Sequence, residues 1–372
     1  MNSGLSRIVF RLGKLNSTRL RGCFKSHPFS TNAAALQTQE KDPLHEGNNL
    51  LKTPSRGVLE IYGDDTVKFL QGMITNNMTR IASGGEGLFT AFLAPNGRVL
   101  YDAFVYPKPQ GTDTSPMFLI ECSAEATRDL MRHIKKYILR SKVKIQDVSE
   151  EYHVWSLWGP KSDLTENRVL EEVAKIRCKD TRYPGFGSRV LLPADKAFPV
   201  PPDFKELPSE EYTIRRILHG VPEGSDFFVG SSLPLESNFD YMNGIDFRKG
   251  CYVGQELTIR THHTGVVRKR IVPVQITPEA DLSTAPSSPD LAQIQVDRDV
   301  KLALAQPGQD VVIDGAKTSR NNGKFCGGIH NIGLALIRLE TVRKPDIRFI
   351  MRASDDKLMN VRPTIPTWWP LD

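Results

Sequence analysis

The chain has 372 residues, of which 39% are hydrophobic and 25% are charged, the balance of an ordinary globular protein. This length allows two or three domains, and no apolar run approaches the roughly 20 residues that span a bilayer. Residues 1–40 hold six Lys or Arg and one acidic residue, so the rest of the chain holds 43 basic and 42 acidic residues. A nearly neutral body gives no support for a nucleic-acid-binding role.

The N-terminal residues 1–40 are basic, rich in Ser and Thr, and free of acidic residues before Glu40. Apolar residues between Leu5 and Leu15 can form one face of a basic amphipathic helix. Such a leader is typical of a mitochondrial transit peptide, and the apolar positions are interrupted by charge too often for a secretory signal. We therefore expect a protein of the mitochondrial matrix.

From residue 55 to 150, strand and helix patterns alternate, which predicts an α+β lobe with an antiparallel sheet. The expected strands are residues 57–62, 88–93, 99–106, 117–121 and 143–148. We expect Asp64 or Asp65 to cap one helix and Ser123 to cap a second. Asn96-Gly97 suits the turn of a hairpin. The Gly-rich residues 84–87 predict a turn and not a phosphate loop, because no helix start follows them.

Residues 151–265 predict a second α+β lobe, with a strand at 152–158 and a helix at 208–219 that ends before Gly220. Residues 266–372 predict a small β-barrel, with strands at 266–276, 311–313 and 332–339. A flexible insertion is expected near 277–292, where Pro, Ser, Thr and Asp are frequent. The pair Trp368-Trp369 is expected to dock the end of the chain against the body.

The five cysteines are scattered, and none forms a Cys-x-x-Cys pair; they are Cys23, Cys122, Cys178, Cys251 and Cys326. A disulfide framework is therefore not expected, and a self-contained zinc or iron–sulfur site would have unusual spacing. This cysteine usage indicates a reducing compartment.

The most informative motif is the octapeptide from Lys249 to Glu256, which places Cys251 between two glycines and beside a lysine. Only the thiolate is a nucleophile and a metal ligand, and Lys249 is expected to favour it. Gln255 and Glu256 are expected to orient the loop. The simpler interpretation, a small buried cysteine packed in a turn, stays open at this point.

Five motifs in order resemble the folate-binding aminomethyltransferase superfamily, and the last of them resembles its YgfZ-type branch. They are Phe69-Leu70-Gln71-Gly72 with Thr75-Asn76-Asn77, Ala94-Pro95-Asn96-Gly97-Arg98 through Asp102, Arg216 with Gly220-Val221-Pro222-Glu223, Pro234-Leu235-Glu236-Ser237-Asn238, and residues 249–256 with Leu257, Arg260 and Thr261. The resemblance covers residues 55–345. With these motifs and the leader, the chain resembles the mitochondrial, Iba-type members of that branch, which are late iron–sulfur cluster assembly factors.

This resemblance implies an α+β fold of three lobes in a ring, in which the transferase branch binds folate. It also implies that tetrahydrofolate, if bound, would meet Asp102, Glu236 and Asn238, with Arg248 able to pair with a folate carboxylate. The transferase branch carries two adjacent acidic residues where this chain has Tyr101-Asp102. One carboxylate is therefore missing from the family's proton-handling pair.

The resemblance further implies that Cys251 is the metal-binding thiol, as a ligand of a bridging iron–sulfur cluster shared with an A-type scaffold protein. One thiolate cannot hold a cluster that usually takes four cysteine-type ligands, so a partner must supply the others. The main hypothesis is a non-enzymatic factor that matures four-iron cluster proteins. The alternatives are a tetrahydrofolate-dependent one-carbon transferase and a folate-binding module without turnover. His262, His263 and Cys326 rank below Cys251 as candidate ligands. His262 and His263 are expected on a strand, where adjacent side chains point to opposite faces, so at most one of them could serve with Cys251. Cys326 is expected in a flexible, glycine-rich setting within residues 323–328.

Overall fold

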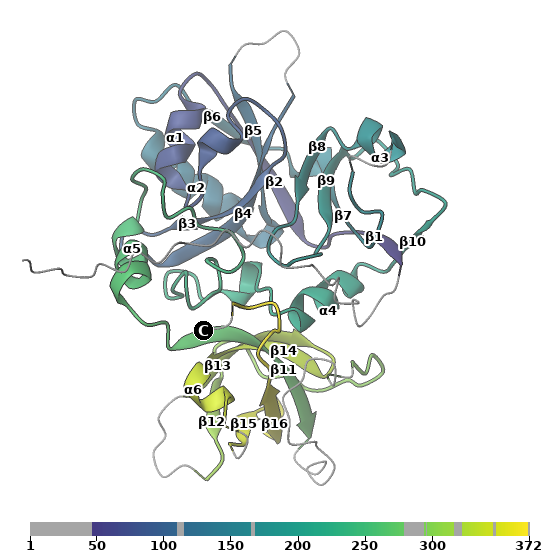
Figure 1. The fold of residues 1–372 in the computed structure, drawn as a ribbon, viewed down its shortest axis with the longest axis vertical. Helices are drawn as coiled ribbons and strands as arrows, with labels where there is room; N and C mark the ends of the chain where they lie inside the picture. Colours follow the sequence, from purple (N-terminus) through teal and green to yellow (C-terminus); the bar gives the residue numbers. More distant parts are fainter. Residues whose placement is uncertain are drawn as a thin grey trace, which may run out of the picture. The chain divides into compact units, whose positions relative to one another are not determined.

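The structure is a computed structural model that describes residues 47–109, 115–164, 168–278, 294, 296–315, 322–344 and 347–370. The predicted leader and most of the predicted insertion near 277–292 lie outside these residues. The described residues contain two five-stranded sheets and one closed six-stranded barrel (Figure 1). This architecture confirms the expected α+β class and the small C-terminal barrel.

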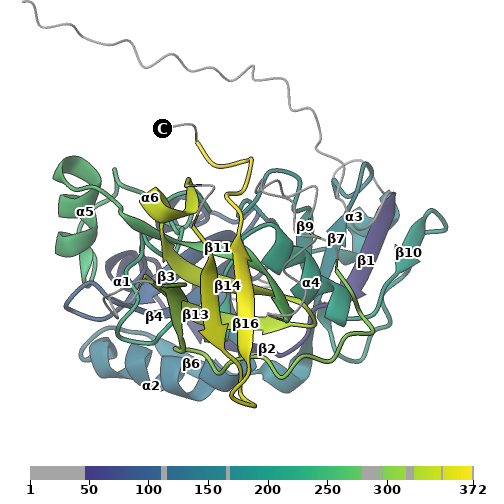
Figure 2. The same ribbon diagram turned by 90° about the horizontal axis from the view of Figure 1, so that it is seen from below.

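The first sheet has the strand order β3-β4-β5-β2-β6, and all neighbouring strands are antiparallel. Its strands are β2 Arg56–Tyr62, β3 Leu88–Leu93, β4 Val99–Pro107, β5 Met117–Ser123 and β6 Lys144–Asp147. The helices α1 (Thr66–Met73) and α2 (Thr127–Ile138), labelled in Figure 2, accompany this sheet. Their apolar side chains share one core with those of the sheet. Each strand predicted between residues 55 and 150 is present.

The second sheet has the order β10-β1-β7-β9-β8. Its strands are β1 Asn48–Lys52, β7 Tyr152–Trp158, β8 Ile176–Lys179, β9 Ser188–Pro193 and β10 Phe204–Glu206. Strand β1 lies between β7, with which it is antiparallel, and β10, with which it is parallel. Only β7 was expected from the sequence, because the other strands are short and show little alternation of polar and apolar residues.

The barrel closes in the order β11-β14-β13-β12-β15-β16. Its strands are β11 Lys269–Pro278, β12 Asp310–Ile313, β13 Gly323–Ile329, β14 Ile332–Arg338, β15 Phe349–Arg352 and β16 Leu358–Pro363. Alternate apolar side chains fill its interior, as in other small barrels. Trp369 is buried against Tyr241, and Trp368 donates a hydrogen bond from Nε1 to the carbonyl of His219 at 2.9 Å. These contacts confirm that the tryptophan pair is a docking contact.

The remaining helices are α3 Arg168–Val173, α4 Glu210–Leu218, α5 Gln255–Thr264 and α6 Leu339–Val342. Short 3₁₀ turns occur at Met78–Arg80, Ala124–Ala126, Ser149–Glu151 and Gly224–Asp226. Helix α4 was expected, whereas α5 was not. The placement of His262 and His263 on a strand was therefore wrong, because both residues lie in the last turn of α5. Two β-branched residues and two histidines weaken the helical pattern there.

Two expected helix caps were wrong. Asp65 precedes α1, but its carboxylate accepts the backbone N–H of Lys142 at 2.7 Å and makes no cap hydrogen bond. Ser123 likewise makes no side-chain cap, because a 3₁₀ turn separates it from α2. For Asp65, a tertiary contact thus replaced the local partner that the sequence suggested.

Residues 219–254, here called the connecting segment, contact both the first sheet and the barrel. Val99 exchanges hydrogen bonds with it, donating to the carbonyl of Ser232 at 2.9 Å and accepting from the N–H of Gly230 at 2.8 Å. On the barrel side, Ile271 donates to the carbonyl of Glu236 at 2.9 Å. The connecting segment has little regular secondary structure, yet these bonds fix its course.

Candidate functional site

Cys251 is exposed on a loop that leads directly into α5. Gly254, which precedes the helix, has φ +79°, and a Cβ there would lie 2.3 Å from the carbonyl oxygen of Ala94. A Cβ on Gly97 would lie 2.9 Å from the carbonyl oxygen of Gly254. Glycine is required at both positions, because the β3–β4 hairpin turn and the Cys251 loop touch through their backbones.

Lys249 anchors the Cys251 loop to the end of α1. Its ammonium donates hydrogen bonds to the carbonyls of Gln71 at 2.7 Å, Ile74 at 2.6 Å and Asn76 at 2.8 Å. Three bonds use all the donors of an ammonium, so Lys249 satisfies carbonyls that the helix end leaves open. Burial lowers the pKa of Lys249 to about 8, and Asp246 opposes that shift. The expected effect of Lys249 on the thiolate stays a prediction.

The other members of the octapeptide secure both sides of the loop. Gln255 accepts the backbone N–H of Tyr252 through Oε1 at 3.3 Å, and Val253 donates to the carbonyl of Gly72 at 2.9 Å. Glu256 is exposed in the first turn of α5, where a negative charge suits the helix N-terminus. These contacts join the Cys251 motif to the Phe69–Asn77 motif, which lies almost 180 residues earlier.

The imidazole of His262 stacks on the ring of Phe247, with centroids 3.6 Å apart. This stacking ties the start of the loop to the last turn of α5. No group of three or more His, Cys, Asp or Glu side chains suited to a metal occurs among the described residues. A metal at Cys251 that needs three or more such ligands would therefore take at least one of them from outside the described part of this chain.

The other three cysteines of the described residues are buried inside strands. Cys122 lies in β5, Cys178 in β8 and Cys326 in β13. Burial raises the pKa of each thiol, to about 12 for Cys122 and well above the usual range for Cys178. The flexible glycine setting expected for Cys326 was wrong, because the glycines around it belong to a barrel strand with a bulge.

Asp102 lies at the edge of a buried network of charges between the two sheets. Its Oδ1 accepts the N–H of Gly224 at 2.9 Å, while Oδ2 has no hydrogen-bond partner within the described ranges. Burial raises the pKa of Asp102, and Arg56 opposes that shift. The carboxyl therefore has one oxygen without a partner in a site where ionisation is costly.

The network itself pairs guanidiniums and carboxylates that come from both sheets, from the loop after β8 and from the connecting segment. Arg56 on β2 bonds to Glu121 at 2.7 Å and to Glu223 at 2.8 Å. Arg182 bonds to Glu223 at 2.5 Å and to Asp180 at 2.7 Å. Burial opposes ionisation of Glu223, but Arg56 and Arg182 outweigh it and hold the pKa of that carboxyl well below its usual range.

Sequence reasoning missed most of this network. Glu121 lies inside the apolar strand β5, and Arg189 lies inside the apolar strand β9. The two residues form a fully buried ion pair with each other. A charged residue at a core-facing position of a strand was the available signal. It could not show which partner, far away in sequence, completes the pair.

The other residues of the expected folate pocket have separate surroundings. Asn238 is fully buried with φ +64°, and its Nδ2 donates to the carbonyl of Ile271 at 2.8 Å. Burial raises the pKa of Glu236, and Lys269 and Arg98 oppose that shift. Arg248 is exposed in the Cys251 loop. Among the described residues, the side-chain hydrogen bonds of this set do not join its members to Asp102 or to one another, so its folate role stays a prediction.

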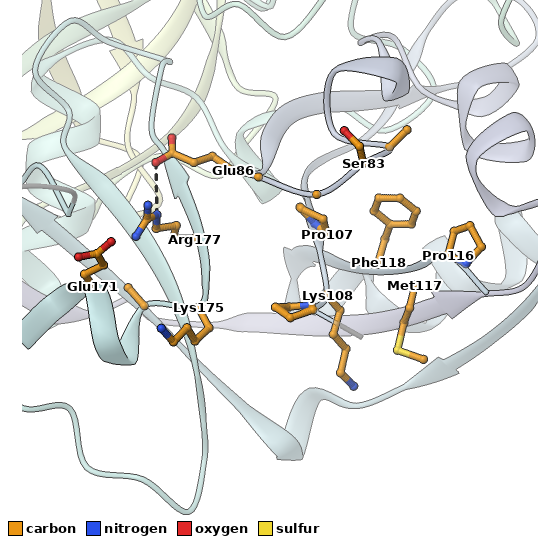
Figure 3. Close-up of a pocket in the computed structure, with 15 residues that line it drawn as sticks. Ser83, Glu86, Pro107, Lys108, Pro116, Met117, Phe118, Glu171, Lys175 and Arg177 are labelled. Carbon is orange, nitrogen blue, oxygen red and sulfur yellow. Dashed lines mark ion pairs between the residues drawn. The ribbon is translucent and has the colours of Figure 1, made fainter. Parts of the chain in front are cut away.

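A hollow of about 690 Å³ lies between the β4–β5 hairpin, residues 82–86 and β8 (Figure 3). Across it, Arg177 forms an ion pair with Glu86 at 3.4 Å, and Phe118 and Met117 lie on the hairpin side. Gly84 and Gly85 both have positive φ, which confirms the expected turn at residues 84–87. None of the described residues that line this hollow is a predicted site residue.

Comparison with known proteins gives the class first. Residues 23–189 match the GCVT N-terminal domain, and residues 268–371 match the CAF17 C-terminal β-barrel domain. The fold is similar to the crystal structure of glycine cleavage system aminomethyltransferase T from Bartonella henselae, with a TM-score of 0.61, 11% identity, and coverage of 88% of this chain and 89% of that one. The chain therefore has the fold of the aminomethyltransferase T class.

Relatives of higher identity define the family. The chain is 45% identical over 315 residues to the mitochondrial iron–sulfur cluster assembly factor IBA57 homolog of Aspergillus fumigatus, covering 77% of this chain and 69% of that one. It is 38% identical over 374 residues to the homolog of Mycosarcoma maydis, covering 93% and 91%. The chain belongs to this family of mitochondrial iron–sulfur cluster assembly factors. The family's mitochondrial location agrees with the leader expected from the sequence.

Proposed function

We propose that this protein matures iron–sulfur proteins in the mitochondrial matrix by supplying Cys251 as one ligand of a cluster that it shares with an A-type scaffold protein. The observation that carries the proposal is the placement of Cys251. Its thiol is the exposed one among the described cysteines, on a loop fixed by Lys249 and by the contact of Gly97 with Gly254. A fixed, accessible thiol suits a ligand that must meet a partner.

The cluster is the cargo of this process, and the chain's own contribution is position. Fixing the loop at both ends reduces the conformational entropy that Cys251 would otherwise lose when a partner binds. A single thiolate leaves the other coordination positions of a cluster to the partner. The shared cluster would then form only when both proteins are present, and it would be transferred when the partner or the client protein exchanges ligands.

The test is anaerobic reconstitution of a cluster with the purified protein and an A-type scaffold. Cys251→Ser should abolish the absorption that depends on both proteins. Gly250→Ala is the matched control, because a Cβ at that position meets nothing within 4 Å and the thiol is retained. In cells that lack the native gene, Cys251→Ser should leave the enzymes that need four-iron clusters inactive. A cluster spectrum or enzyme activity equal to that of the wild type would contradict the proposal.

Folate binding without turnover is a second candidate, favoured by Oδ2 of Asp102, which has no hydrogen-bond partner among the residues that the structure describes. A carboxyl group with a free oxygen can bind the N–H groups of a pterin ring. Titration of tetrahydrofolate into the purified protein, followed by intrinsic tryptophan fluorescence, tests this role. Asp102→Asn should weaken saturable binding, and a titration without saturation would exclude folate as a ligand.

A further inference from the structure

Residues 128–144 carry an unusual concentration of positive charge. They hold seven Lys or Arg and one acidic residue, whereas the rest of residues 41–372 holds 36 Lys or Arg and 41 Asp or Glu. The body of the protein outside this stretch is thus acidic. A local field of opposite sign, confined to one helix and the turn that follows it, is suited to steer a partner of negative charge.

All seven of these basic residues are exposed, on α2 or on the residues that follow it; they are Arg128, Arg132, Lys135, Lys136, Arg140, Lys142 and Lys144. Two of them have acidic partners: Arg132 pairs with Asp129 at 2.9 Å, and Lys142 pairs with Asp64 at 3.5 Å. The opposite face of α2 packs on the first sheet through Leu130 and Ile134, so the basic residues are not needed to hold the helix.

A hollow of about 780 Å³ lies beside the C-terminal end of α2. Phe69 of α1 and Tyr137 and Ile138 of α2 supply its apolar lining. Lys68 and Arg140 supply positive charge, against one negative charge from Asp65. Leu139 also lines it and is 88% exposed, which adds a large apolar side chain at the rim. We call residues 128–144 and this hollow together the basic docking surface.

Helix α1 links the basic docking surface to the anchor of the Cys251 loop. Helix α1 supplies Lys68 and Phe69 to the hollow, and the carbonyls of Gln71 and Gly72 receive the Lys249 and Val253 hydrogen bonds. With a rise of about 1.5 Å per residue, Phe69 and Gly72 are about 5 Å apart along the helix axis. Val253 packs against the same apolar core as Phe69, Tyr137 and Ile138.

We infer that the basic docking surface binds an acidic face of the protein that shares the cluster with Cys251; the inference rests on the function proposed above. Charge complementarity selects an acidic partner. The recessed aromatic and aliphatic lining selects a protein, because a protein can insert one apolar side chain into a hollow, whereas a flat lipid surface or a phosphate backbone cannot fill it. Docking at this surface would bring the partner's ligands beside the exposed thiol.

The test measures binding of the purified A-type scaffold to the full protein by titration calorimetry. The triple variant Lys135→Glu, Lys136→Glu and Arg140→Glu should weaken binding by about tenfold or more at low salt, and the loss should shrink as salt rises. The control is a second triple variant, Lys196→Glu, Lys205→Glu and Lys301→Glu, which changes the net charge by the same amount at exposed positions elsewhere. It should bind the scaffold as the wild type does. If the triple charge reversal unfolds the protein, the triple variant Lys135→Gln, Lys136→Gln and Arg140→Gln removes the same charges without reversing them.

Leu139→Asn tests the apolar half of the surface and should weaken binding without changing its salt dependence. Residue 139 has φ 43° and ψ −104°, which is unfavourable for leucine and asparagine alike, and the side chain is exposed, so the variant should fold. Cys251→Ser should keep the scaffold bound while losing the shared cluster, which separates docking from ligation. Wild-type affinity in both the charge and the Leu139 variants would overturn the inference and leave the role of Cys251 standing. Preferential binding of the surface to anionic vesicles or RNA would also overturn it.

Discussion

At the scale of single residues, Lys249 shows how a side chain can serve a site through the backbone. A lysine next to a cysteine suggests an activating cation. The three carbonyls around its ammonium also make it the anchor of the loop that carries Cys251. Its nearest neighbours in sequence suggested one role, and its distant neighbours in space define another.

Lys249→Met should therefore destabilise the protein and loosen the Cys251 loop. Methionine keeps much of the side-chain volume but leaves three carbonyl acceptors without their donor, which we expect to cost about 3 kcal/mol. Urea unfolding measures the stability, and hydrogen exchange at residues 250–254 measures the loosening. Lys357→Met, at an exposed position, is the control and should change neither. Unchanged stability and exchange in Lys249→Met would contradict the anchoring role.

Asp102 and Glu223 should respond oppositely to loss of charge, although both are buried. Burial raises the pKa of Asp102, so its ionisation costs stability as the pH rises from 3.8 through the raised value. Asp102→Asn keeps the acceptor for the N–H of Gly224, and its stability relative to the wild type should be greater at pH 7 than at pH 4. Thermal unfolding across that range is the measurement. If the stability of the variant relative to the wild type falls as the pH rises, the assignment is contradicted.

Glu223→Gln should lose about 3 kcal/mol at neutral pH, because buried guanidiniums would be left without their carboxylate. The pKa of Glu223 is held well below 4.5, so the stability it provides is complete above pH 4.5 and is lost as the pH falls through its lowered pKa. The deficit of the variant should therefore shrink only in acid. A deficit that is constant from pH 7 to pH 3 would argue against this account.

At the scale of secondary-structure elements, the sequence was informative where patterns were long and local. The strands of the first sheet and helix α4 have clear periodicity, and the turn at Asn96-Gly97 has its own chemistry, so all were predicted. Strands β1, β8 and β10 are short and depend on partners far away in sequence, and β13 was hidden by its glycines. Helix α5 has weak helix formers and is held by tertiary contacts.

The contrast between local patterns and long-range pairing applies to the candidate site as well. Cys251 was found because a motif surrounds it, and the meeting of its loop with residues 71–76 and 94–97 could not be read from any local pattern. The charges between the sheets were missed for the same reason, since Arg56, Glu121 and Glu223 belong to three different segments. Pairing across long sequence separations is decided by packing and not by spacing.

The two glycines that flank Cys251 should differ in their tolerance of substitution. Gly254→Ala forces a Cβ against the carbonyl oxygen of Ala94 at a position with positive φ, and should cost about 2 kcal/mol. Gly250→Ala meets nothing within 4 Å and should change stability by less than about 0.5 kcal/mol. Chemical denaturation of the two variants makes the comparison, and equal stabilities would show that the hairpin contact is unimportant.

At the scale of the whole molecule, the connecting segment joins the first sheet and the barrel. Arg270 on β11 bonds to the carbonyl of Leu235 and to the carboxylate of Asp240, and Asp246 donates its N–H to the carbonyl of Thr75 at 3.1 Å. Because these bonds are buried or nearly so, the barrel and the first sheet should unfold together and not as separate units.

Trp369→Ala tests this coupling from the barrel side. Trp369 packs on Tyr241 of the connecting segment and lies near the guanidinium of Arg270, so its truncation should cost about 3–5 kcal/mol. Calorimetry should show one transition at a lower temperature. Two resolved transitions, with the first confined to the barrel, would contradict a single cooperative unit.

The unequal exposure of the cysteines has a practical consequence for experiments. Cys122, Cys178 and Cys326 are buried, with raised pKa values, and Cys251 is exposed. After Cys23→Ser removes the thiol of the leader, a maleimide dye at neutral pH should label one position of the native protein without further engineering. That dye would sit where the partner is expected to arrive, so its fluorescence could follow the encounter of the two proteins in real time.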